Sequence, residues 1–403
     1  MMLDIKPIFS ALLRSKVGAV LLFLQIALTT AIVSNAAFMI NDNLSYLRED
    51  TGYPQQEIFS FTVMTFGKDI DLRQQGELDE AMLRQIPGVI NATLTQAVPL
   101  SGGGSSTSIR LKPRPEQSRE GRLMYFYGDE YALDTFGVEL IEGRNFRPEE
   151  IMISDSYHDN GPNTIIVSQA LAKSMFDDES ALGKSIYVDG RALEIIGVVA
   201  LMESAWPRAE DSNTTGIIPY INAQSYQHFL VRTDANERAN VMKIIEDKML
   251  AAYDKRVIIN VDGLDESKEA YDATDVLMMR MLIVLVVVLV LVTALGIFGL
   301  TQFNISKRTK QIGTRRALGA RKSAIVRYFL VENAMICTVG LVIGSIAAVF
   351  LGRGLMQTYS IGALELEYVL VTALFILIMS LLAVVVPARR AANISPSIAT
   401  RSI

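Results

Sequence analysis

Four long apolar runs limit the folds open to this chain, and they cover roughly residues 17–40, 276–302, 329–351 and 368–386. Within the second run, residues 281–300 read MLIVLVVVLVLVTALGIFGL, and Thr293 is the one polar side chain among them. At about 1.5 Å per residue, this stretch forms a helix about 30 Å long, which matches the hydrocarbon core of a bilayer. The pattern predicts an α-helical membrane protein with four transmembrane helices.

A polar block, residues 41–275, separates the first run from the second. It contains 39 Asp and Glu against 22 Lys and Arg, whereas the rest of the chain contains 4 acids against 16 bases. This charge separation favours an acidic domain inserted between the first two spans of a basic membrane part, and it gives no support to nucleic-acid binding. The predicted domains are therefore 1–40, with an amphipathic helix at 5–16 before the first span; 41–275, the inserted domain with a stalk; and 276–403, the remaining three spans.

The short segment between the second and third runs decides the expected orientation. Residues 304–327 read NISKRTKQIGTRRALGARKSAIVR and carry eight Lys and Arg with no acid. Short basic loops stay in the cytoplasm. We therefore expect both termini and this loop inside a bacterial inner membrane, and the inserted domain in the periplasm. A cleaved signal peptide at 17–40 is the alternative for the first run, whose length favours a retained span.

The basic loop has a helix-forming composition around residues 307–318. A small surface helix joined rigidly to a membrane span would give a cytoplasmic partner something to push on. The alternative is a basic flank that only sets the topology of the spans.

Small and polar residues inside the runs indicate where helices touch. Small residues recur every fourth position in the third run, at Gly340, Gly344, Ala348 and Gly352. This spacing predicts a flat face for close helix packing, although membrane helices are rich in Gly and Ala generally. The polar residues of the first run, Gln25, Thr29, Thr30 and Asn35, are expected to face neighbouring helices, with a transport pathway as the alternative. Glu332 needs interfacial water or a partner such as Arg327.

The inserted domain has the pattern of a mixed α/β fold. Strands are expected at 57–66, 89–98, 122–128, 163–167, 185–188, 192–199, 228–232 and 256–261, and helices at 78–86, 130–136, 168–176 and 235–253. Asp189-Gly190 predicts a two-residue hairpin turn. The SGGGSS stretch at 101–106 predicts a flexible connector at a seam between subdomains. Residues 263–275 are expected to continue as a helical stalk into the second span.

The sequence contains no strong motif for catalysis, metal binding or nucleotide binding. Gly183-Lys184-Ser185 imitates the end of a phosphate-binding loop, but Asp178 stands where that motif needs glycine, and strand and turn follow it instead of a helix. The two histidines, His158 and His228, are far apart, and the single cysteine, Cys337, can form no intrachain disulfide. We therefore expect no catalytic, metal or cofactor site on this chain, and no ATPase of its own.

Three stretches carry a resemblance to a known family. They are SKRTKQIGTRRALGARKSAIVRYFLVEN at 306–333, VPARRAANISPSIATR at 386–401, and the segments of 131–199 that include YALDTFGVELIEGRNF and LGKSIYVDGRALEIIGVV. The second keeps a Pro-Ala…Ala-Ala…Pro…Ala…Arg ending through Pro387, Ala388, Ala391, Ala392, Pro396, Ala399 and Arg401. Together these stretches resemble FtsX-like permeases of the MacB type.

The resemblance implies a permease subunit that transmits motion from a separate ABC ATPase, present in two copies and carrying the ATP and magnesium. It also implies a second permease, identical or paralogous, and in an export system a periplasmic adaptor and an outer-membrane channel. The residues that would couple to the ATPase are Lys307, Arg308, Lys310, Gln311, Ile312, Gly313, Arg315, Arg316 and Leu318. Gln311, Ser395 and Ile398 stand where relatives commonly have acids, which suits a heterodimer with a more typical paralogue.

Two other functions fit the same topology. One is a signalling or scaffold protein whose outer domain activates a periplasmic partner such as a cell-wall hydrolase. The other is a permease that releases lipoproteins from the inner membrane. The size of the inserted block favours export, because a simple relay needs less protein outside the membrane.

Overall fold

The computed structural model describes residues 16–67, 70–114, 116–154, 161–359 and 362–395. The expected amphipathic helix at 5–16 lies almost wholly outside these ranges, as do His158, Pro396, Ile398, Ala399 and Arg401. The chain divides into two compact units. We call Met1–Arg48 with Thr274–Ile403 the helical unit, and Glu49–Ala273 the inserted domain.

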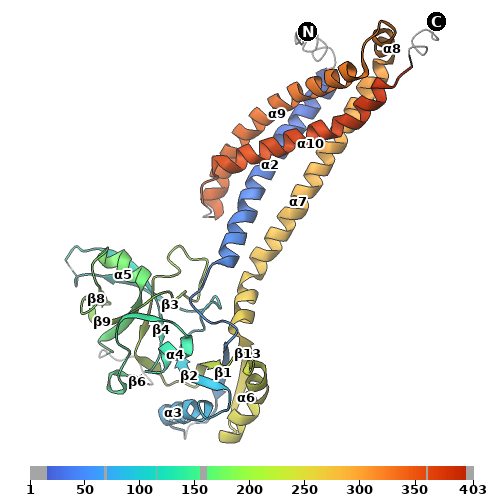
Figure 1. Ribbon diagram of the computed structural model, residues 1–403. Coiled ribbons are helices and arrows are strands. Elements are labelled where there is room, and N and C mark those ends of the chain that lie inside the picture. The colour runs from blue at the N-terminus through green and yellow to red at the C-terminus, as the bar shows by residue number, and fades with distance from the viewer. Residues whose placement is uncertain (1–15, 68–69, 115, 155–160, 360–361, 396–403) are drawn as a thin grey trace. The chain divides into compact units, whose positions relative to one another are not determined.

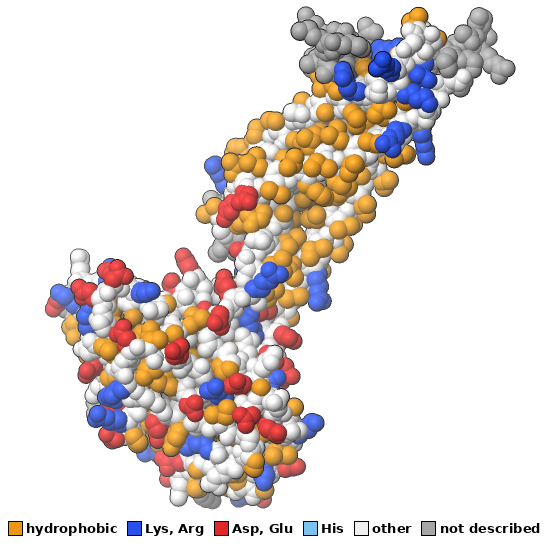
Figure 2. All heavy atoms as spheres, in the orientation of Figure 1, with side chains coloured by type: hydrophobic (Ala, Val, Ile, Leu, Met, Phe, Trp, Pro, Cys, Tyr) orange, Lys and Arg blue, Asp and Glu red, His pale blue; other side chains and the backbone are white. Residues whose placement is uncertain are grey.

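The helical unit contains the long apolar helices. Those described are α2 (Lys16–Arg48), α7 (Leu264–Lys307), α9 (Lys322–Tyr359) and α10 (Leu366–Ala392), and Figure 1 labels each of them. Among the described residues, four helices are long and apolar enough to cross a membrane. A wide hydrophobic surface covers the middle of this unit in Figure 2. The prediction of four spans with an α/β domain between the first and second is confirmed.

One apolar core joins the helices of this unit. Helix α9 packs against both α2 and α10. Ile26 of α2, Phe329 and Leu341 of α9, and Ile376 of α10 are buried in one cluster. Helix α7 is more exposed than the other three long helices, because only 11% of its most apolar 18-residue segment is buried.

The inserted domain contains two main β-sheets. The four-stranded sheet has the order β13-β1-β12-β2, and the seven-stranded sheet has the order β5-β9-β7-β10-β4-β3-β8. A third, two-stranded sheet pairs β11 with β6. The strands are β1 (Ile58–Thr65), β2 (Val89–Thr95), β3 (Ser105–Arg110), β4 (Glu120–Tyr127), β5 (Leu140–Gly143), β6 (Met152–Ser154), β7 (Thr164–Ser168), β8 (Ser185–Val188), β9 (Arg191–Val199), β10 (Thr215–Ile218), β11 (Tyr220–Asn222), β12 (Tyr226–Thr233) and β13 (Arg256–Gly263).

Helices cover these sheets. They are α3 (Leu72–Leu83), α4 (Ala132–Phe136), α5 (Gln169–Phe176), α6 (Arg238–Ala252) and the short 3-10 helix η1 (Pro148–Glu150). Helix α3 begins earlier than its apolar spacing predicts, because Asp71 caps it by accepting from the backbone N–H groups of Arg73 and Gln74. The predicted hairpin at Asp189-Gly190 is confirmed. Both residues have positive φ, 48° and 85°, as the central residues of a type I′ turn require.

The two main sheets share a hydrophobic core. Ile58 and Leu230 from the four-stranded sheet pack in one buried cluster with Phe126, Ile166 and Ile217 from the seven-stranded sheet. Residues 101–106 connect one sheet to the other, but the last two already belong to β3. The stretch predicted as a flexible connector is therefore partly strand, and it joins two sheets that pack together.

Two boundaries differ from the sequence prediction. Helix α2 continues to Arg48 rather than ending near residue 40, so the inserted domain begins at Glu49. Residues 41–48 are polar and give no hydropathy signal, although they are helical. Strands β3, β5, β6, β10 and β11 were not predicted, because short strands without regular alternation leave little pattern to detect.

Candidate functional site

The basic segment between the second and third spans folds into a short helix. Helix α8 (Thr309–Ala317) lies between the end of α7 at Lys307 and the start of α9 at Lys322. Arg308 interrupts the helical path with φ −106° and ψ 15°. After α8, Gly319 adopts φ +90°, a left-handed conformation that suits glycine and turns the chain toward α9. We call residues 307–322 the basic elbow.

A buried ion pair attaches the elbow to α9. One guanidinium nitrogen of Arg308, Nη1, donates to Oε1 of Glu332 at 3.0 Å and to Oε2 at 3.1 Å. The same nitrogen lies 3.3 Å from the hydroxyl of Tyr328. Glu332 is 5% exposed, so its charge depends on this partner.

Glu332 was expected to need interfacial water or a partner such as Arg327, and its partner is Arg308 instead. Residues five positions apart on an α-helix point to different faces, and Arg327 is exposed. The actual partner, Arg308, is distant in sequence and reaches Glu332 because the chain reverses direction through α8. Sequence spacing alone carries no signal for that pairing.

Apolar and aromatic contacts reinforce the attachment. Ile312 is buried in the same cluster as Ile325 and Phe329 of α9. The guanidinium of Arg315 lies over the ring of Tyr328, 5.2 Å from its centroid. Arg316 donates to the backbone carbonyl of Ala320 at 3.0 Å. These contacts attach the elbow to the first part of α9, and α8 also contacts α10.

The opposite side of the elbow is open. Exposed residues on it are Lys307, Lys310, Gln311, Arg315 and Leu318, whereas Ile312 and Gly313 are buried and Arg308 and Arg316 are half-buried. Leu318 is 83% exposed, the highest value among the exposed large hydrophobic side chains described. Figure 2 shows Lys and Arg side chains gathered at this end of the helical unit. A cationic surface with one projecting leucine is suited to an acidic protein partner.

The small residues of the third span lie against α2. A Cβ added to Gly340 would lie 2.9 Å from Cγ2 of Ile26, and one added to Gly344 would lie 2.6 Å from the carbonyl oxygen of Ala27. Ala348 is fully buried, and its carbonyl accepts from Nδ2 of Asn35 at 3.0 Å. The fourth small residue, Gly352, is also next to the Asn35 side chain.

The polar residues of α2 contact neighbouring helices. The hydroxyls of Thr29 and Thr293 are 2.8 Å apart and link α2 to α7. The amide of Gln25 lies against Gly296 of α7. Thr30 donates to the carbonyl of Ile26 within its own helix. Thr29, Thr30 and Asn35 thus have hydrogen-bond partners inside the apolar unit, and Gln25 lies beside α7.

A second polar contact, between α9 and α10, was missed by the sequence reasoning. Nδ2 of Asn333 lies 3.4 Å from the backbone carbonyl of Ser380, and Sγ of Cys337 lies 3.0 Å from the Ser380 hydroxyl. Isolated polar residues in two separate apolar runs are the only signal for it, and such residues do not identify their partners.

The first turn of α7 is fixed inside the inserted domain. Arg238 of α6 forms two hydrogen bonds with the carboxylate of Asp265, at 2.7 and 3.1 Å. Leu264 is fully buried in the core shared by the two sheets. The carboxylate of Glu266 accepts from the backbone N–H of Gly263 at 2.8 Å. The same helix continues without interruption to Lys307.

Four apolar helices, an α/β domain between the first two, and a basic elbow after the second are the features of a multi-pass membrane protein. The sequence comparisons specify the family. Residues 17–248 match the MacB-like periplasmic core domain, and residues 283–396 match the FtsX-like permease C-terminal domain. The chain belongs to the ABC permeases that combine these two domains, and the suspected family resemblance is confirmed.

Individual relatives are distant. The macrolide export ATP-binding/permease protein MacB of Neisseria gonorrhoeae is 22% identical over 343 residues, which cover 83% of this chain and 50% of that protein. The uncharacterized ABC transporter permease YknZ of Bacillus subtilis is 22% identical over 315 residues, 74% of each chain. This chain thus spans about half the length of the MacB relative.

Solved structures match the inserted domain only loosely. The periplasmic region of MacB from Actinobacillus actinomycetemcomitans matches with a TM-score of 0.33 and 15% identity, covering 57% of this chain and 98% of that one. At that TM-score the match adds nothing to the fold described above.

Proposed function

We propose that this chain is the membrane subunit of an ABC export system and that its basic elbow receives the motion of a separate ATPase. The observation that carries the proposal is the two-sided elbow. Its inner side is fixed to α9 by Arg308, Glu332 and Ile312, and its outer side presents cations and Leu318. A rigid element with an open, charged face is suited to transmit force from a partner.

The distribution of charge supports the proposed orientation. The elbow carries cations at one end of the helical unit, and short basic loops remain in the cytoplasm. In this orientation both termini are cytoplasmic, and the inserted domain is on the periplasmic side of a bacterial inner membrane.

Two routes lead from the elbow toward the periplasm. In the first, movement of α8 pulls on Glu332 and shifts α9, which packs on α2 through Gly340, Gly344 and Ala348. In the second, the elbow moves the end of α7, and the first turn of that helix is fixed in the inserted domain by Asp265. Both routes move the inserted domain without passing cargo between the spans, which is the mechanotransmission mode of action.

The proposed partners are those of an ABC export system. N. gonorrhoeae MacB is named as an ATP-binding/permease protein, and this chain spans about half its length. We propose that this chain works with a separate ATP-binding subunit, present in two copies, which binds ATP and magnesium. A second permease, a periplasmic adaptor and an outer-membrane channel complete the proposed assembly. Gln311 is exposed on α8, and its neutral side chain favours a paralogous second permease over an identical one.

The test is charge reversal on α8. The full chain is purified with the ABC-type ATPase that accompanies it, and ATP hydrolysis and complex recovery are measured. Arg315→Glu together with Arg316→Glu is expected to reduce recovery of the complex about tenfold or more, because a reversed charge repels an acidic surface. Lys310→Glu reverses a charge at an exposed position and leaves the contacts of Arg315 with Tyr328 and of Arg316 with Ala320 in place.

The matched control is Arg353→Glu, which reverses an exposed cation at the other end of α9. This variant is expected to leave the complex intact. Full recovery and full ATPase coupling in all the α8 variants would show that the elbow is not the coupling element.

A further inference from the structure

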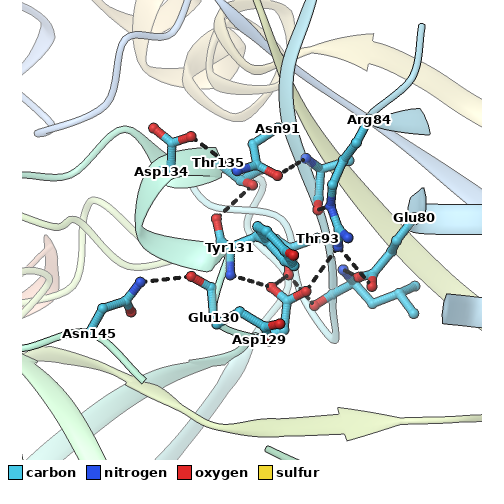
Figure 3. Close-up of polar contacts among 12 residues, drawn as sticks. Glu80, Arg84, Asn91, Thr93, Asp129, Glu130, Tyr131, Asp134, Thr135 and Asn145 are labelled. Atoms are coloured by element: carbon cyan, nitrogen blue, oxygen red, sulfur yellow. Dashed lines mark hydrogen bonds and ion pairs between the residues drawn. The ribbon is translucent and has the colours of Figure 1, made fainter. Parts of the chain in front are cut away.

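A buried charged cluster in the inserted domain has no part in the coupling scheme. Figure 3 shows it between α3, β2 and the turn that leads from β4 to α4. Nη2 of Arg84 lies 3.1 Å from Oε2 of Glu80 and 3.1 Å from Oδ2 of Asp129. Glu80 is 6% exposed and Asp129 is 5% exposed. Two buried carboxylates therefore share a single nitrogen of one guanidinium.

The cluster closes the free edge of the four-stranded sheet. Strand β2 is the last strand of that sheet, so one side of it lacks a neighbouring strand. The backbone N–H of Leu94 donates to Oε1 of Glu80 at 2.6 Å, and the carbonyl of Ala92 accepts from Nε of Arg84 at 3.1 Å. Side chains of α3 thus take the place of a strand that would otherwise pair there.

Asp129 connects the turn after β4 to the same edge. Its Oδ1 accepts from the hydroxyl of Thr93 at 2.7 Å and from the backbone N–H of Tyr131 at 3.0 Å. The Tyr131 ring lies under the Arg84 guanidinium, 3.7 Å from its centroid. Loosening of the cluster would therefore affect α3, β2 and the turn together.

The charges of the cluster do not balance. Glu80 and Asp129 supply two negative charges, and Arg84 supplies one positive charge. Glu130 is the next residue along the turn and adds a third carboxylate nearby. Arg73 and Glu77 line the adjoining cavity of about 280 Å³, but both are exposed and their charges are opposite.

Other charged groups around the cluster are engaged elsewhere. Asp134 of α4 accepts from the side chain of Asn91, and Asp79 of α3 pairs with Arg256. Among the residues that the structure describes, no grouping of three or more His, Cys, Asp or Glu could hold a metal ion. The buried excess is therefore one negative charge, and a proton is the smallest cation that can neutralise it.

The pKa shifts of the two buried carboxyl groups agree with an excess of one negative charge. Burial raises the pKa of Asp129 from 3.8 to about 6, against the lowering effects of the Thr93 hydrogen bond and of Arg84. Burial, followed by the charge of Asp129, raises the pKa of Glu80 well above its ordinary 4.5. The two groups take up the proton as a pair.

We propose that the Glu80–Arg84–Asp129 cluster is a proton-binding site and that protonation strengthens the attachment of α3 and the β4–α4 turn to the edge of β2. The closed cluster binds a proton more tightly than the same carboxylates do in water. Acidification therefore favours the closed cluster, whereas above about pH 6 the cluster holds an uncompensated charge and opens more readily. Opening frees the Leu94 N–H and the Ala92 carbonyl, which are the groups that an added strand would use.

The test is hydrogen exchange on the full chain in lipid nanodiscs between pH 5 and pH 8. Protection factors, corrected for the intrinsic pH dependence of exchange, are measured for the amides of β2. With a closed-state pKa of about 6, protection is expected to fall about tenfold from pH 5 to pH 8. The amides of β7, in the other main sheet, are expected to change much less.

Variants separate this site from other titrating groups. Asp129→Asn, which imitates the protonated carboxyl, is expected to keep β2 protected at both pH values. Asp134→Asn makes the same change at a neighbouring carboxylate outside the Glu80–Arg84–Asp129 cluster. This variant is expected to retain the tenfold fall in the protection of β2. His228 of β12 cannot produce the effect, because burial lowers its pKa and its protonation in acid would destabilise the strand.

The wild-type pH series tests the proposal by itself, even where a variant fails to fold. Constant protection of β2 across this pH range would overturn the proposal. An equal change in β2 and β7 would also overturn it, because that result would indicate a global effect of pH.

Discussion

Arg308 and Glu332 are far apart in the sequence, yet a guanidinium nitrogen of Arg308 lies 3.0 and 3.1 Å from the two carboxylate oxygens of Glu332. This pair connects the residue just before α8 to the first third of α9. Their side chains are 18% and 6% exposed, so little water reaches either charge. The pair is thus the polar connection between the elbow and the helix that packs on α2.

Removing one partner is expected to destabilise the helical unit. Glu332→Ala leaves the Arg308 charge buried and unpaired, which costs about 3 kcal/mol. Thermal unfolding of the full chain in detergent micelles measures the loss as a lower Tm. Glu365→Ala, at an exposed acid just before α10, is the control and is expected to change little. Equal Tm values for the two variants would mean that the ion pair contributes nothing.

Gly344 is expected to tolerate no side chain. A Cβ there would lie 2.6 Å from the carbonyl oxygen of Ala27, so Gly344→Ala forces α9 away from α2 at a cost of about 2 kcal/mol. Gly299→Ala on α7 is the matched control, because a Cβ there meets nothing within 4 Å. A crosslink between cysteines at the α2–α9 contact should form more slowly in Gly344→Ala only.

These helix contacts illustrate what sequence can and cannot predict. Long apolar runs give the spans, and the four-residue spacing from Gly340 to Gly352 identifies a packing face, because both depend on local periodicity. The partner of Glu332 depends on how α8 reverses the chain. Likewise, the Glu80–Arg84–Asp129 cluster joins a helix to a distant turn. Short strands such as β10 and β11 exist because neighbouring strands provide hydrogen-bond partners, which no local pattern records.

The buried pair in the inserted domain is expected to matter more than an exposed one. Asp79 and Arg256 are 2.6 Å apart, with side chains 3% and 0% exposed. Asp79→Ala should cost about 3–5 kcal/mol by leaving Arg256 buried without its partner. Glu116→Ala breaks the exposed Lys112–Glu116 ion pair, whose side chains are 58% and 59% exposed. This change should cost less than about 0.5 kcal/mol of folding free energy. The two variants are compared by denaturant titration of the full chain, with unfolding of the inserted domain detected by its susceptibility to proteolysis. Equal denaturant midpoints for the two variants would contradict the expected difference in stability.

The Arg144–Glu150 pair predicts a pH dependence of opposite sign to that of the buried cluster. Hydrogen bonding to Arg144 lowers the pKa of Glu150 from 4.5 to about 2. The pair therefore stabilises the fold above about pH 4.5, and this contribution is lost as the pH falls toward about 2. Wild type should be more stable than Glu150→Gln at pH 7, with the difference shrinking by pH 3. A difference that stays constant from pH 7 to pH 3 would rule out this linkage.

The most direct measurement of the central claim is the accessibility of Leu318, the projecting residue of the elbow. Cys337 is the only native cysteine and is buried, so Leu318→Cys introduces a single reactive thiol. A membrane-impermeant maleimide is predicted to label it in inverted inner-membrane vesicles and not in intact cells, and binding of the ATPase subunit is predicted to reduce that labelling. Labelling from the periplasmic side of intact cells would contradict the account.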